Sequence, residues 1–164
     1  MNKNKLLSIY VNDHLAGSTL GLELAKRARA SNEGTPLADF LDRLVREIET
    51  DRETLKRLMR ELGIRPDPLK TYGAWVAEKL GRLKLNGQIT GYSPLSRLVE
   101  LEGLYLGITG KLEMWIALER ALANDAAGVE FAELRRRAER QAAEVEQHRL
   151  ETAEAVLAAP GRSS

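Results

Sequence analysis

The stretch SNEGTP, residues 31 to 36, separates two long helical segments and predicts a tight turn between them. Gly34 is a good helix terminator, because glycine tolerates the left-handed backbone found just past a helix end. Thr35 is a favoured N-cap residue, and Pro36 suits the first position of the helix that follows. The sequence therefore predicts two helices that pack against each other as an antiparallel hairpin.

The same start and stop signals recur along the chain. Asp67 and Pro68 begin one further segment, Ser93 and Pro94 begin another, and NDAAG, residues 124 to 128, separates the last two. Helices are predicted over residues 4–31, 36–63, 68–86, 94–123 and 129–158. No alternating strand pattern of useful length appears, so the predicted fold class is all-α. We expect one helical domain over residues 1–158 and a flexible tail over residues 159–164.

Apolar residues recur at three- and four-residue spacing in the long segments, which is typical of helices with one face toward a core. The connections after the first helix and the fourth are short, so these helices form two hairpins. The helix over 68–86 lies between the hairpins and is long enough to carry the chain along a bundle. This order resembles the ferritin-like superfamily. The resemblance implies an up-down-down-up four-helix bundle with an additional crossover helix.

Composition excludes several functional classes. The chain has 164 residues, a formal charge of +1 and no cysteine, which excludes disulfides, thiolate metal sites and cysteine nucleophiles. The basic run RRR, residues 135 to 137, is diluted by neighbouring acids and is interpreted as a solvated face, so no nucleic-acid partner is expected. No apolar run approaches membrane-spanning length, and the N-terminal apolar run is too short and too interrupted to be interpreted as an export signal. A cytoplasmic protein without a membrane partner is the expectation.

Each long helix carries one strongly polar residue on its otherwise apolar line: His14, Asp51, Glu102 and His148. A buried charge is costly, so such a group pairs, loses its charge, binds a metal or reaches water. Counting from the two turns places His14 level with Asp51, and Glu102 level with His148. The leading interpretation is that these residues are structural His–carboxylate anchors that fix how the helices pack.

The alternative is a divalent metal site for iron, manganese or zinc, formed by His14, Asp51, Glu102, Glu144 and His148. The ferritin-like resemblance implies a bridging carboxylate at Glu102 and a histidine ligand at His148, with Glu144 as a neighbour. The family's Glu-x-x-His motif is not reproduced, however. Glu144 and His148 are one residue too far apart, and the helix over 36–63 has no histidine. No standard di-iron site is therefore expected.

Glycines inside the helices are a second unusual feature. Gly17 and Gly21 belong to the first helix, and Gly103, Gly107 and Gly110 to the fourth. Tight helix packing is the plainer interpretation. The more specific interpretation is a cavity or a subunit contact lined by Gly103, Gly107 and Met114, with Trp115 nearby. A subunit contact there would make the protein a homodimer.

Together these patterns predict a non-catalytic structural or interaction protein, with stress and carrier proteins as the kinds considered. The alternative is an iron- or manganese-binding metalloprotein with oxygen or peroxide chemistry. A third hypothesis is that an apolar ligand binds beside the glycine-rich helix faces. Whether the protein is an enzyme, and which small molecule or protein it meets, is not decided by the sequence.

Overall fold

A computed structural model describes residues 3–67, 92–122 and 128–158. Within these ranges the chain is helical and contains no strand, which confirms the all-α prediction. The helices are α1 (Lys3–Ser31), α2 (Pro36–Glu61), α4 (Pro94–Ala121) and α5 (Phe131–Leu157). Their bounds lie within about two residues of the predicted ones, as expected for frayed helix ends. The helix predicted over 68–86 and the tail over 159–164 lie outside the described residues.

Local chemistry explains where α2 and α4 begin. The Thr35 side chain accepts a hydrogen bond from the Ala38 amide, and the Ser93 hydroxyl accepts one from the Ser96 amide. Each cap is followed by a proline, which has no amide hydrogen to leave unpaired at the first helical position. Gly34 adopts a φ of 78°, the left-handed conformation that the turn requires. The sequence signals in SNEGTP therefore act as predicted.

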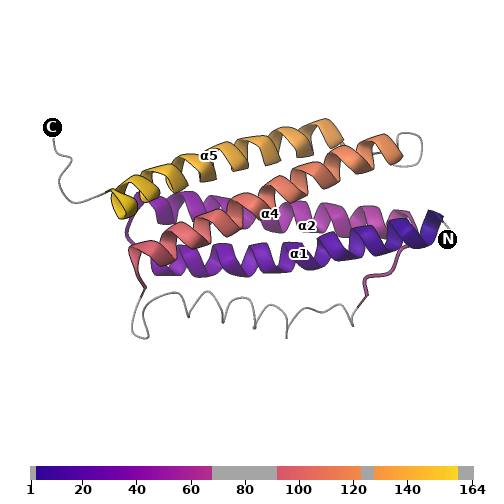
Figure 1. Ribbon diagram of the computed structural model, residues 1–164. Coiled ribbons are helices and arrows are strands. Elements are labelled where there is room, and N and C mark those ends of the chain that lie inside the picture. The colour runs from indigo at the N-terminus through magenta and orange to yellow at the C-terminus, as the bar shows by residue number, and fades with distance from the viewer. Residues whose placement is uncertain (1–2, 68–91, 123–127, 159–164) are drawn as a thin grey trace.

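The four helices lie side by side as two hairpins (Figure 1). Helix α1 packs against α2 and α4, and α4 also packs against α5, whereas α2 and α5 approach each other at few positions. Successive contacts define the directions. Leu24 and Arg27 of α1 meet Gly103 and Glu100 of α4, and Arg43 and Glu47 of α2 meet Glu144 and Arg140 of α5. Helices α1 and α5 therefore run in one direction, and α2 and α4 in the other.

The apolar core is formed by two groups of side chains at opposite ends of the bundle. One group joins the second half of α1 to the first halves of α2 and α4 and includes Leu24, Ala25, Leu41, Leu44, Ile48, Leu101, Leu104 and Ile108. The other includes Val11, Leu55, Leu58, Met59, Met114, Trp115, Leu118, Phe131 and Leu134. Asp51 of α2 falls between Ile48 of the first group and Leu55 of the second. A charged residue thus marks the boundary between two apolar clusters.

The buried face of α4 differs in part from the predicted one. The sequence predicts a line through Leu98, Glu102, Tyr105, Thr109, Leu112 and Ile116, widened by Leu101, Ile108 and Trp115. The structure centres the buried face on the widening residues, together with Leu104 and Leu118. Glu102 consequently lies outside the core, and its side chain is 48% exposed. Leucines occur around much of α4, so apolar periodicity alone does not identify the inward side. Packing against α1 and α5 decides it.

The described helices contain no segment that is both long enough and apolar enough to cross a membrane.

Candidate functional site

The structure does not bring the five candidate metal residues together. His14 and Asp51 line one pocket between helices. Glu102 lies 3.8 Å from Arg149, while Glu144 pairs with Arg43 and Arg140. His148 packs its ring 4.7 Å from the Phe40 ring and lies 3.6 Å from Glu151. Among the residues that the structure describes, no three His, Asp or Glu side chains are placed to hold a metal ion.

Asp51 is the polar anchor that the sequence predicted, but its partners are cations and not His14. Only 2% of its side chain is exposed, and Lys111 Nζ and Arg137 Nη1 donate to its two carboxylate oxygens at 2.5 and 2.9 Å. These partners come from α4 and α5. The carboxylate therefore links three helices at the boundary between the two core groups.

Gln141 extends this link. Its side-chain oxygen accepts from Lys111 Nζ at 2.5 Å, and its amide nitrogen donates to Glu47 at 2.7 Å. Burial lowers the Lys111 pKa, and the neighbouring Asp51 carboxylate opposes that shift. The α2 and α5 backbones approach each other at few positions, and long polar side chains fill the distance between these helices.

Lys111 and Arg137 were missed in the sequence, although a signal for each was present. Lys111 lies three residues after Ile108 and four before Trp115, which is the spacing of one helix face. Arg137 lies three residues after Leu134 and four before Gln141. Interpretation of residues 135–137 as a solvated face is wrong for Arg137, because its guanidinium contacts buried Asp51.

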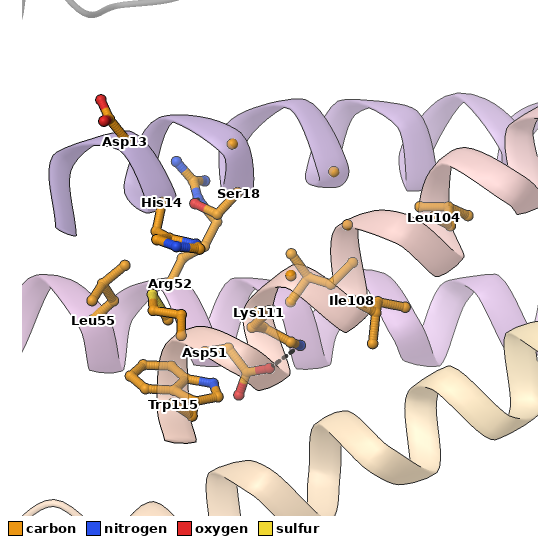
Figure 2. A pocket seen from close by; sticks show the side chains of 16 residues that line it. Asp13, His14, Ser18, Asp51, Arg52, Leu55, Leu104, Ile108, Lys111 and Trp115 are labelled. Carbon is orange, nitrogen blue, oxygen red and sulfur yellow. Dashed lines mark hydrogen bonds and ion pairs between the residues drawn. The ribbon is translucent and has the colours of Figure 1, made fainter. Parts of the chain in front are cut away.

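The pocket that contains His14 and Asp51 has a volume of about 310 Å³ and lies between α1, α2 and α4 (Figure 2). It is lined by Asp13, His14, Gly17, Ser18, Gly21, Ile48, Asp51, Arg52, Leu55, Leu104, Gly107, Ile108, Gly110, Lys111, Met114 and Trp115. The lining is mainly apolar, with a few polar groups at defined positions. Such a combination is typical of small-molecule sites, and the volume is at the small end of their range.

Four glycines keep this pocket open. A Cβ added at Gly17, Gly21, Gly107 or Gly110 would meet no atom of another element within 4 Å. Gly103 differs, because its added Cβ would lie 2.9 Å from Leu24 Cδ2, where α1 and α4 pack tightly. Both interpretations of the helical glycines therefore apply: close packing at Gly103, and open space at the other four.

His14 lies on the α1 side of the pocket. Its ring packs edge-on against Tyr10, with 4.6 Å between the ring centroids. Burial lowers the His14 pKa, and nearby Asp13 opposes the shift. The imidazole is therefore mainly neutral at pH 7, with one nitrogen able to donate and the other able to accept.

A separate polar cluster lies where α1 meets the start of α4. The Glu100 side chain is 1% exposed, Tyr92 donates to it at 2.9 Å, and Arg27 lies 2.8 Å away. Asn32 donates in turn to the Tyr92 hydroxyl at 2.8 Å. Burial raises the Glu100 pKa above its ordinary 4.5, against the opposing effects of Tyr92 and Arg27. The sequence did not single out Glu100, because it lies beside the predicted face of α4.

This raised pKa predicts that the contribution of Glu100 to stability falls as pH rises, the opposite of the usual behaviour of a carboxylate in an ion pair. A folded-state pKa above the unfolded one means that the folded protein binds the proton more tightly, so this contribution falls as pH rises above 4.5 through the raised pKa. Glu100→Gln removes the titration, so its free energy of unfolding should rise relative to wild type over that pH interval. Urea denaturation at several pH values measures the difference. Glu102→Gln, on the exposed side of α4, serves as control, and a difference that falls with pH would contradict the assignment.

Comparison of the chain with protein-family models, curated proteins and solved structures finds no match. The geometry of the described residues is therefore the basis on which a function can be assigned.

Proposed function

We propose that this protein is a non-catalytic binding protein that holds one small, mainly apolar molecule in the pocket between α1, α2 and α4. The observation that carries the proposal is the set of four helical glycines around a pocket of about 310 Å³. The walls beyond them are formed by Leu104, Ile108 and other core side chains. Apolar walls of this kind favour a ligand that leaves water.

The glycines would be hard to explain if the pocket had no occupant. A glycine in a helix interior costs about 0.5–1 kcal/mol relative to alanine. Alanine would meet no neighbour at these four positions, so each glycine lowers stability without relieving a clash. Open space for a ligand is a direct physical reason for glycine there.

The structural interpretation drawn from the sequence supports this proposal in one respect. Asp51, Lys111 and Arg137 hold α2, α4 and α5 together immediately beside the pocket, which keeps its walls in place. We also propose a ferritin-like arrangement, supported by the directions of the four described helices. The metal-binding alternative has less support, because only His14 and Asp51 of its five residues line the same pocket. A homodimer stays a prediction that light scattering can test.

Blocking the pocket should weaken ligand binding without unfolding the protein. Leucine at Gly107 would project into the open space from α4, and leucine at Gly21 would do so from α1. We expect each variant to bind N-phenyl-1-naphthylamine, a neutral fluorescent probe, at least about tenfold more weakly than wild type, a loss of about 1.4 kcal/mol. Fluorescence titration measures the affinity. Far-UV circular dichroism checks that the helices are intact.

Ala143→Leu is the matched control, because it adds a leucine on the exposed side of α5, away from the pocket. Its probe affinity should equal that of wild type. The proposed function fails if wild type does not bind the probe, or if both glycine variants bind it as well as wild type does.

A further inference from the structure

We infer that the ligand carries a single carboxylate, and that Arg52 binds it at the α1 side of the pocket. This inference rests on the proposed function and adds the chemical class of the ligand: an apolar body with one anionic head. Arg52 projects from α2, lines the pocket and reaches Ser18 on α1 (Figure 2).

The guanidinium of Arg52 is held in place by hydroxyls and not by an acid. Its Nε donates to Ser18 Oγ and its Nη2 donates to Thr19 Oγ1, both at 2.9 Å. The two hydroxyls are oriented in turn, because each donates to the Leu15 carbonyl. No carboxylate among the described residues lies within 4 Å of this guanidinium. The remaining N–H donors of Arg52 are thus available to an oxygen-bearing ligand.

The buried cations near the pocket already have a carboxylate partner. Lys111 and Arg137 share the Asp51 carboxylate, so they attract a bound anion less strongly than Arg52 does. Asp13 also lines the pocket, but Figure 2 shows its carboxylate directed away from Arg52. Arg52 forms no ion pair within 4 Å among the described residues, although the Glu53 carboxylate on the same helix feels its charge. One such cation matches one negative charge. An arginine fork also matches the two oxygens of a carboxylate in geometry.

His14 supplies a second polar contact. It precedes Ser18 by one helical turn on α1 and lines the same pocket, so its ring lies on the same side of α1 as the Arg52–Ser18 contact. The imidazole has no hydrogen-bond partner in the part of the chain that the structure describes. A carboxylate at Arg52 could therefore accept a hydrogen bond from His14, while the apolar body extends past Gly21 and Gly107 toward Ile108.

The test compares two molecules of similar size and shape, 2-naphthoate and the neutral 2-isopropylnaphthalene, by displacement of N-phenyl-1-naphthylamine at pH 7. Arg52→Gln should weaken 2-naphthoate binding by at least about tenfold, the loss of one charge-assisted contact. Affinity for 2-isopropylnaphthalene should change less than about threefold, which also shows that the pocket remains folded. Arg52→Lys should give an intermediate affinity for 2-naphthoate, because an ammonium cannot reproduce the fork.

Arg57→Gln is the matched control. Arg57 lies on the exposed surface of α2, and this substitution removes the same positive charge as Arg52→Gln. It should leave both affinities unchanged. If both molecules bind wild type but Arg52→Gln affects them equally, the carboxylate inference is overturned and the proposed function stands. If wild type binds neither the probe nor either naphthalene, the proposed function fails, and the inference fails with it.

Discussion

Replacing Asp51 by alanine should lower the free energy of unfolding by about 3–5 kcal/mol, the loss expected when one partner of a buried ion pair is removed. The carboxylate is 2% exposed and accepts from Lys111 and Arg137. Its removal leaves two cations facing each other at the boundary between the core groups. Chemical denaturation at pH 7, followed by far-UV circular dichroism, measures the loss.

Two further variants distinguish loss of a charge partner from loss of packing. Asp51→Ala combined with Lys111→Met removes both the acid and the more buried of the two cations, so it should be more stable than Asp51→Ala alone. Asp42→Ala, at an exposed position of α2 that pairs with Arg29 and Arg46, should cost much less. Equal losses at Asp51 and Asp42 would show that burial of the Asp51 network does not contribute as described.

Trp115 gives the second large effect. Its side chain is completely buried, packs 6.4 Å from the Phe131 ring between centroids, and forms part of the pocket wall. Trp115→Ala should cost about 3–5 kcal/mol, because a large void replaces an indole in contact with core side chains. Thermal and urea denaturation, each followed by far-UV circular dichroism, measure the change.

Trp115→Phe separates the volume of the indole from its N–H group. The Trp115 Nε1 atom is buried and has no hydrogen-bond partner among the described residues. Removing an unpaired buried donor loses no hydrogen bond, so phenylalanine should cost only about 1–2 kcal/mol, from its smaller volume. A loss equal to that of Trp115→Ala would instead show that the indole N–H contributes to stability.

Local signals in the sequence account for most of the helix ends. Thr35 and Ser93 have side chains that cap a helix, and the prolines after them fit only the first turn, so α2 and α4 begin where predicted. The spacing of three and four residues in the sequence also identifies the buried line of α2, which runs through Leu41, Leu44, Ile48, Asp51, Leu55 and Leu58. Helix α2 is strongly amphipathic, so its own sequence identifies the inward side.

Helix α4 shows where this reasoning stops. Apolar residues occur on most of its sides, and Leu106 remains 70% exposed. Turning α4 about its axis by the angle between neighbouring residues, about 100°, moves Glu102 out of the core and brings Glu100 and Lys111 into it. Nothing in the sequence of α4 alone favours one of these two orientations. The position of a residue along the bundle could be counted from the turns, but its direction around the helix could not.

The sequence by itself determined that the protein is helical, where the described helices begin and end, and that Asp51 and the interior glycines are anomalous. These properties depend on a residue and its near neighbours in the chain. Only the tertiary structure decided that Lys111 and Arg137 neutralise Asp51, and that glycines of α1 and α4 face one open space. Those contacts join residues tens of positions apart, and they depend on the rotation and spacing of whole helices, which packing of all their side chains sets together.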